Sequence, residues 1–243
     1  MVVARIAGVE KPVEPQARPV EAPSRRRPLA DVTAEIRVQA RSRLARGAKR
    51  AIDIVGSAAG LVTLAPVFAA TALAVKATSH GPIFYVQDRC GLGGRRFRFY
   101  KFRTMVVDAE ELKADLEHLN EMQGPVFKIA SDPRITRLGA VLRKLSIDEL
   151  PQLWNVLKGD MSLVGPRPPM PCEVEQYTRD HVQRLAVVPG ITGLWQVSGR
   201  SEIPEFDRWL ELDLEYSRTW SLWLDLWILA KTPFVVLTTR GAQ

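Results

Sequence analysis

The sequence predicts an α/β fold that is mostly helical and carries a small β-hairpin or sheet. Residues 82–87 and 97–102 alternate apolar and polar side chains or carry β-favouring aromatics, and glycines between them predict a hairpin turn. Apolar residues recur at helical spacing over 135–145 and 150–157, and Gly159 follows as a helix stop. A polar helix is expected over 106–122.

The composition fits a globular protein that binds anionic partners. Its 243 residues are 46% hydrophobic, and 34 Lys and Arg outnumber 27 Asp and Glu. Such an excess suits nucleic acid, anionic lipid or phosphorylated substrates, and charge alone does not choose among them. Cys90 and Cys172 follow no CxxC spacing, and the first apolar run begins only near residue 51, so we expect a reducing, cytoplasmic setting.

Three regions follow from these patterns. Residues 1–45 are rich in proline and basic side chains and are expected to form a disordered extension, with a basic helix approaching the apolar run over 31–50. Residues 46–80 form a membrane segment, and residues 81–243 form a compact cytoplasmic domain.

The membrane segment is expected to be a re-entrant hairpin with its bend at Pro66. Residues 54–75 carry no charge and are long enough to cross a bilayer, so a tilted single span is the alternative. Proline near the middle of a helix bends or breaks it. Basic residues flank both ends of the run, among them Lys49 and Arg50 before it and Arg89 after it. Both flanks therefore favour the cytoplasmic side, which a hairpin satisfies.

Four tryptophans lie towards the C terminus: Trp209, Trp220, Trp223 and Trp227. Their placement in helical segments interrupted by charges predicts interfacial amphipathic helices, and ordinary core positions are the alternative.

The densest chemistry lies at residues 143–151, where Asp148 and Glu149 adjoin Arg143 and Lys144. One interpretation is structural, since Ser146 and Glu149 fit a capping box at a helix start. The other is catalytic, because a carboxylate beside cations and free N–H groups can attack a phosphorus atom.

Further cations stand in strands and rigid loops. Arg167 lies between prolines in Gly165–Pro169, while Lys101 and Arg103 alternate along a predicted strand and so share a face. Residues 189–193 and 197–200 are turn-rich, and the second loop contains Arg200.

Several segments, in this order, resemble the bacterial sugar transferase family, the monotopic phosphoglycosyl transferases. The resemblance runs from about Lys49 to Arg240 and is closest to the exopolysaccharide-initiating hexose-1-phosphate transferases. It rests on KRAIDI, KFRTM, LRKLSIDELPQLWNVLKGDMSLVGPRP, PGITGLWQVSGR and LDLEYSRTWSLWLDL.

The resemblance implies a mechanism and a location. Asp148 would be the covalent nucleophile attacking the β-phosphate of a UDP-sugar, with UMP leaving, Glu149 its catalytic partner and Mg²⁺ bound beside Asp148. Polyprenyl phosphate, as undecaprenyl phosphate, would then accept the phosphosugar at the cytoplasmic face of the bacterial inner membrane. Phosphates would be held, or the site braced, by Lys101, Arg143, Arg167 and Arg200, with Asp213 at its edge.

Two positions depart from the family pattern. Val188 stands before Pro189 where arginine is frequent, and Ala65 precedes Pro66 where serine is common. The first puts one phosphate contact in question, and the second removes a hydroxyl near the bend.

Two other functions fit part of these sequence features. A non-catalytic, membrane-docked scaffold of a polysaccharide synthesis complex explains the charge and hydropathy equally well, but not the combination of carboxylates, arginines and rigid loops. Nucleic acid is not expected as a partner, because the aromatics cluster with leucines near the C terminus. Membrane lipids are expected partners. The sequence does not choose the sugar, for which glucose and galactose are expected, and it leaves a homo-oligomer open.

Overall fold

The computed structural model describes residues 28–36, 42–121, 126–127, 129, 131–199 and 206–238. In these ranges the chain is mostly helical with two small two-stranded sheets, which confirms this part of the predicted fold class. Residues 1–27 of the predicted extension and Arg200 lie outside the described residues.

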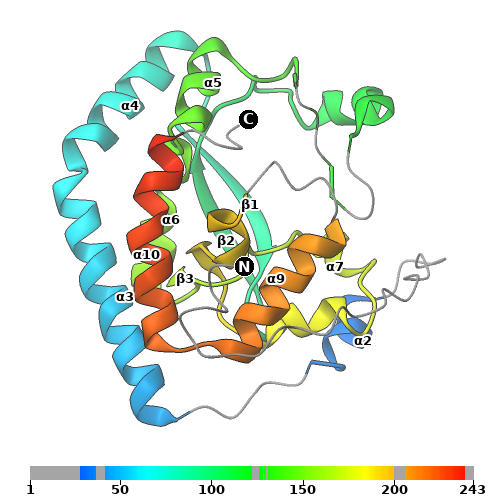
Figure 1. The fold of residues 1–243 in the computed structure, drawn as a ribbon. Helices are drawn as coiled ribbons and strands as arrows, with labels where there is room; N and C mark the ends of the chain where they lie inside the picture. The colour runs from blue at the N-terminus through cyan, green and yellow to red at the C-terminus, as the bar shows by residue number, and fades with distance from the viewer. Residues whose placement is uncertain are drawn as a thin grey trace.

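A long bent helix pair forms one side of the molecule (Figure 1). Helix α3 spans Arg43–Thr63, helix α4 spans Ala65–Thr78, and the pair is bent by 60°. The bend lies at Leu64, so the prediction of a bend at Pro66 was wrong by two residues. Proline is tolerated in the first turn of a helix, and Pro66 takes that place in α4. No described helix alone is long and apolar enough to cross a membrane, whereas the bent pair together passes on length and composition.

Basic residues at the start of α3 bind the rest of the protein. Arg50 donates hydrogen bonds to the carbonyls of Val156 and Leu157, at 2.6 and 2.7 Å, and so satisfies the end of a neighbouring helix. Lys49 forms an ion pair with Asp225. Two cations that were expected only to flank a membrane segment therefore anchor α3 to the domain.

The predicted β-hairpin is confirmed, with shifted ends. Strand β1, Phe84–Cys90, pairs antiparallel with β2, Arg96–Phe102, through a short 3₁₀ turn, η1, at Leu92–Gly94. Phe102 contacts both Phe84 and Phe68, with ring centroids 5.2 and 5.5 Å apart. These aromatic contacts pack α4 against the hairpin.

The helices after the hairpin are shorter than predicted. A polar helix was predicted over 106–122, but among the described residues 106–121 only Glu111–Leu119 (η2) is regular, and it is a 3₁₀ helix. Helix α5 spans Arg137–Lys144, and after a short 3₁₀ turn, η3 (Ile147–Glu149), helix α6 spans Gln152–Lys158. Gly159 ends α6 in the left-handed conformation, as predicted.

A second sheet is parallel and very short. Strand β3, Ser162–Val164, pairs with β4, Gly190–Thr192. Residues 189–193 were predicted to be only a turn-rich loop, so β4 is a correction. Between the strands lie α7, Pro171–Val174, and the 3₁₀ helix η4, His181–Ala186.

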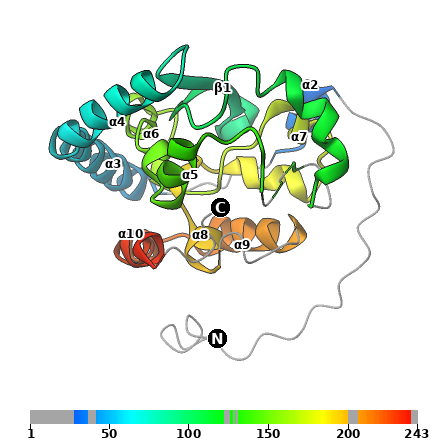
Figure 2. The ribbon, with the colours of Figure 1, turned by 90° about the horizontal axis from the view of Figure 1, so that it is seen from above.

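The main core joins the C-terminal helices to the second sheet. Helices α8 (Leu194–Val197), α9 (Phe206–Thr219) and α10 (Leu222–Leu237) lie on the side opposite β1 (Figure 2). Helix α2, Leu29–Thr33, buries Val32 completely in this core. This part of the predicted disordered extension is therefore ordered, and no single helix covers 31–50, because α2 ends at Thr33 and α3 starts at Arg43.

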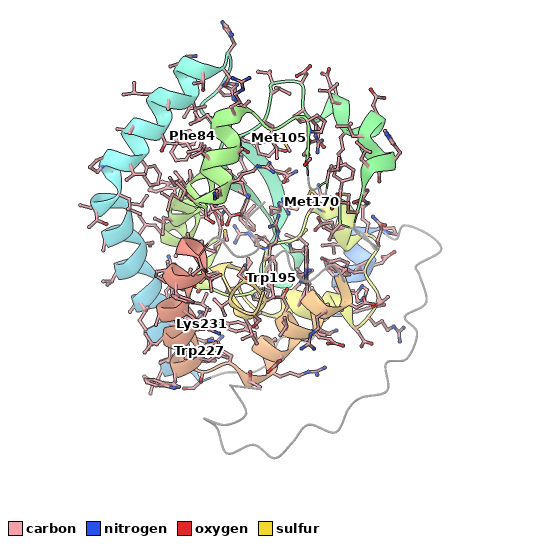
Figure 3. The ribbon with its side chains drawn as sticks, turned by 45° about the horizontal axis from the view of Figure 1, so that its top comes forward. Phe84, Met105, Met170, Trp195, Trp227 and Lys231 are labelled. Carbon is pink, nitrogen blue, oxygen red and sulfur yellow. The ribbon has the colours of Figure 1, made fainter. Side chains whose placement is uncertain are left out.

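The tryptophans divide between the two expected roles. Trp209 is buried and stacks on Trp195, with ring centroids 4.8 Å apart, whereas Trp223 is 72% exposed. Trp220 packs partly against the core and donates a hydrogen bond to Asp225. Trp227 also packs partly against the core and carries Lys231 over its ring (Figure 3).

Candidate active site

The acidic pair lies in the tight connection between α5 and α6. Ser146 has φ of 55°, and it is the only non-glycine residue with a positive φ in the described chain. Its side chain makes no capping hydrogen bond, so the predicted capping box was wrong. A left-handed serine is strained, and such strain is concentrated at functional sites. The turn directs Asp148 inward, where it is only 5% exposed.

Lys101 faces the acidic pair from the last part of β2. Its Nζ lies 2.7 Å from Glu149 Oε1 and 3.7 Å from Asp148 Oδ2. Burial raises the pKa of Asp148 above its ordinary value, Lys101 acts against this rise, and the adjacent charge of Glu149 adds to it. The predicted lysine and carboxylates are thus brought together, in a place where two negative charges need a cation.

Arg143 approaches Asp148 from the last turn of α5. Its Nε donates a 3.0 Å hydrogen bond to Thr104 Oγ1, which fixes the guanidinium. Burial lowers the pKa of Arg143, and the charge of Asp148 partly opposes that effect. The side chain nevertheless stays cationic at neutral pH, since arginine loses its proton only in strong base.

Arg167 is held by a loop that the second sheet fixes. Gly165 donates to the Thr192 carbonyl and Gly190 donates to the Pro166 carbonyl, at 2.8 and 2.9 Å. A Cβ on Gly165 would lie 2.4 Å from a backbone oxygen, so only glycine allows this approach. The Arg167 side chain is exposed and lines the same cavity as Asp148.

Asp213 lies behind this loop. It is 1% exposed, does not line the cavity, and forms an ion pair with the buried Arg184. Arg184 also donates to the Arg167 carbonyl at 3.2 Å and to Tyr177 Oη at 3.0 Å. Asp213 therefore supports the Arg167 loop through Arg184 and does not itself face the cavity.

These groups surround one cavity of about 470 Å³. Its lining includes Lys101, Arg143, Asp148, Glu149 and Arg167, which among the described residues is every predicted catalytic or phosphate-binding residue except Asp213. The lining also includes Phe84, Met105, Met170 and Trp195, which come from four separate segments of the chain and are labelled in Figure 3.

Several buried arginines that line the cavity were not predicted as site residues, among them Arg89 and Arg184. Arg89 was assigned to the basic flank of the membrane segment, but it is 6% exposed and lines the cavity. It donates to the Pro168 carbonyl and to Gln87 Oε1, and burial lowers its pKa to about 10. Gln87 and Arg89 are two residues apart on β1 and so share a face, which was the signal in the sequence that could have identified Arg89. Arg184, in η4, carried none.

The carboxylates suit a magnesium ion whose other ligands come from the substrate and water. The described residues contain no group of three or more His, Cys, Asp or Glu side chains that could hold a metal. Mg²⁺, however, is usually held by one or two carboxylates together with substrate phosphates and water. Asp148 and Glu149 provide that number of carboxylates, so the donor set fits a cation that is completed by its substrate.

A buried aspartate with a half-buried glutamate beside it, facing cations from a strand, a helix and a rigid loop, defines a site for phosphate-ester chemistry. Residues 44–239 match the family described as bacterial sugar transferase. The chain belongs to this family.

Curated relatives carry related names. The galactosyl transferase CpsE of Streptococcus agalactiae is 50% identical over 196 residues, covering 81% of this chain and 43% of that protein. The undecaprenyl-phosphate galactose phosphotransferase of Salmonella typhimurium is 44% identical over 205 residues, 82% of this chain and 42% of its own length. The exopolysaccharide production protein ExoY of Rhizobium meliloti is 41% identical over 199 residues, 80% of this chain and 88% of its own. The chain thus spans less than half of the first two relatives and most of the third.

Proposed function

We propose that this protein transfers a hexose-1-phosphate from a UDP-sugar to undecaprenyl phosphate and so starts the synthesis of an exopolysaccharide or related glycan. The observation that carries the proposal is the buried Asp148 with Lys101 Nζ 3.7 Å from its Oδ2 and with Glu149 beside it. The names of the relatives, which include galactose and glucose phosphotransferases, agree with this chemistry.

The transfer would take two displacements at one phosphorus atom. A carboxylate oxygen of Asp148 attacks the β-phosphorus of the UDP-sugar, and the bond from that phosphorus to the bridging oxygen breaks. The bridging oxygen takes the electron pair and leaves with UMP. A phosphate oxygen of undecaprenyl phosphate then attacks the phosphosugar, the bond to Asp148 breaks, and the carboxylate is restored.

The cations around Asp148 would reduce its repulsion from the diphosphate. Lys101 and Arg143 already face the carboxylate, and Arg167 lines the cavity from the opposite loop. Glu149 holds Lys101 in place through its 2.7 Å ion pair. A magnesium ion bound by Asp148 and Glu149 would supply further positive charge for the phosphates.

The helix pair α3–α4 would place this site at the lipid. Its outer surface exposes large apolar residues, among them Val55, Val62 and Leu73, and exposed basic residues stand at both ends, among them Arg46 and Lys76. Such a pair suits a re-entrant hairpin that enters and leaves on the cytoplasmic face of the inner membrane. The exposed Trp223 and Phe234 on α10 suit an interfacial position.

The central test uses purified protein in detergent with UDP-galactose or UDP-glucose and undecaprenyl phosphate. Wild type should release UMP and form the lipid-linked sugar diphosphate. Asp148→Asn should lose activity by several orders of magnitude, and Glu149→Gln should lose much of it. Asp88→Asn, an exposed carboxylate on β1 outside the cavity, is the matched control. Full transfer by Asp148→Asn would refute the mechanism.

The covalent step has its own test. Without lipid acceptor, the enzyme should release about one UMP per active site, and mass spectrometry should find a sugar phosphate on Asp148. A scaffold would release no UMP from any UDP-sugar. Removal of divalent cations by a chelator should stop UMP release, and added Mg²⁺ should restore it.

Topology is tested by labelling single cysteines. Ala45→Cys and His80→Cys are made in a Cys172→Ser background, because Cys172 is exposed whereas Cys90 is buried. Both new thiols should be shielded from a membrane-impermeant reagent added outside intact cells. Labelling of only one would show a full span.

A further inference from the structure

Three uncharged polar side chains of the cavity have unused hydrogen-bonding atoms. They are Gln152 Nε2, Trp195 Nε1 and Gln196 Oε1, and none has a partner among the described residues. All three residues line the cavity that contains Asp148. Gln152 is 2% exposed and Trp195 is 6% exposed, so solvent reaches neither side chain freely.

Unused polar atoms in such a place indicate a ligand. A buried donor or acceptor without a partner destabilises the folded protein, so native proteins keep few of them outside binding sites. Two donors and one acceptor on one cavity form a set that a ligand with both kinds of group would satisfy.

The chemistry of the set differs from that of the phosphate-binding groups. Lys101, Arg143 and Arg167 are cationic donors, which suit phosphate oxygens. Gln152 and Trp195 are neutral donors and Gln196 offers an acceptor, which suits hydroxyl groups because each hydroxyl both donates and accepts. A hexose carries several hydroxyls on one small ring.

The position of Gln152 selects the hexose over the nucleoside. Gln152 follows Asp148 by four residues, and Leu150 and Pro151 between them have right-handed helical dihedrals. The chain between them is a 3₁₀ turn that leads into α6, so the two residues lie close together, and both line the cavity. If Asp148 attacks the β-phosphorus, the group joined directly to that phosphate is the sugar, whereas the ribose lies beyond the α-phosphate.

The indole of Trp195 is held in a fixed orientation. It stacks on Trp209 with an interplanar angle of 24°, and both rings line the cavity (Figure 3 labels Trp195). Its N–H is thus preorganised, which favours discrimination between hydroxyl configurations.

We propose that Gln152, Trp195 and Gln196 form the hexose subsite and that Gln152 and Trp195 are specificity-determining residues. The inference rests on the proposed function, because it assigns the sugar of the UDP-sugar to these groups. It predicts that hexose selection depends on the start of α6 and on α8, two elements that are far apart in the sequence.

The test compares Gln152→Met and Trp195→Phe with wild type. Methionine has nearly the size of glutamine without its donor, and phenylalanine keeps an aromatic ring without the N–H. Gln176→Met, whose amide bonds the Cys172 carbonyl outside the cavity, is the control. We measure kcat/KM for UDP-galactose and UDP-glucose, inhibition by UMP, which lacks the sugar, and the thermal midpoint.

Each variant should lower kcat/KM for the preferred donor by about 10-fold to 100-fold and change the ratio between the two donors. Inhibition by UMP should stay within about twofold of wild type. With donors that each lack one hydroxyl, one of them should be used equally by wild type and by Gln152→Met, because the lost hydroxyl is the one that Gln152 binds.

Two results would contradict the proposed hexose subsite. Unchanged kcat/KM in both variants would overturn the subsite, and a matching loss of UMP inhibition would assign the residues to the nucleotide. If Gln152→Met does not fold, Trp195→Phe decides alone. If wild type releases no UMP from any UDP-sugar, the proposed function fails, and the subsite fails with it.

Discussion

Lys49 donates a 2.9 Å hydrogen bond to the carbonyl of Val164, three residues before Arg167. The same ammonium lies 2.7 Å from Asp225. Tyr216 Oη lies 2.7 Å from Asp225 Oδ1 and 3.0 Å from the Val164 carbonyl oxygen, so its single proton has both as acceptors. Through this network the first helix of the bent pair is joined to the strand that carries the Arg167 loop. The helix pair is thus part of the framework of the site.

Lys49→Met should lower the free energy of unfolding by about 2–3 kcal/mol, because it leaves Asp225 buried with only its neutral donors, Tyr216 and Trp220. Thermal or denaturant unfolding in detergent measures the change. Arg46→Met, one turn earlier and exposed, should have almost no effect. Equal stabilities for the two variants would show that the network is not a structural link.

Lys101→Met should reduce kcat/KM for UMP release by about 100-fold or more without unfolding the protein. The substitution removes the cation shared by Asp148 and Glu149, so the carboxylates repel the incoming diphosphate. Lys158→Met is the control, because Lys158 is a half-exposed partner of Asp160 outside the cavity. Normal turnover in Lys101→Met would remove Lys101 from the proposed machinery.

Much of the local structure follows from local sequence. The pattern over 82–87 and 97–102 and the glycines between them were sufficient for the hairpin, although its strands span Phe84–Cys90 and Arg96–Phe102. Helical periodicity with Gly159 was sufficient for α6. The capping box failed because it assumed a regular helix start at Ser146, whereas that residue is left-handed and α6 begins six residues later.

The rest of the fold and of the site depends on contacts between segments that are distant in the sequence. The sequence places three basic residues in the flanks of a membrane segment: Lys49, Arg50 and Arg89. In the structure each donates a hydrogen bond to the carbonyl of a residue that is distant in the chain. Charge in a sequence does not show whether a side chain faces solvent or a carbonyl. The motifs around Asp148 and Arg167 identified the site, while the supporting Arg184 required the fold.

Gly139→Ala should destabilise the protein by about 1–3 kcal/mol, as over-packing usually does. A Cβ there would lie 2.0 Å from the Thr104 backbone oxygen, so α5 would have to move away from the segment that binds Arg143. UMP release should fall as well, because Arg143 moves with α5. Gly47→Ala is the control: nothing lies within 4 Å of its Cβ position, and alanine there should stabilise α3 by up to about 1 kcal/mol. A neutral Gly139→Ala would contradict the close contact.

His181 should make the folded protein less stable in acid. This histidine is buried between Tyr177 and Phe206, with Asp207 3.7 Å from its Nε2 and Arg184 nearby. Burial lowers its pKa below the ordinary value near 6.5, although Asp207 opposes the effect. Below pH 6.5 the unfolded chain therefore binds a proton that the folded protein does not.

The free energy of unfolding should consequently fall as the pH falls below 6.5, by at most about 1.4 kcal/mol per pH unit for this one proton. His181→Phe, which suits the aromatic surroundings, should remove that part of the pH dependence, whereas His118→Gln at an exposed position on η2 should retain it. Denaturant unfolding between pH 5 and 7.5 measures both variants. The same slope in wild type and in His181→Phe would show that this buried imidazole does not govern the acid response.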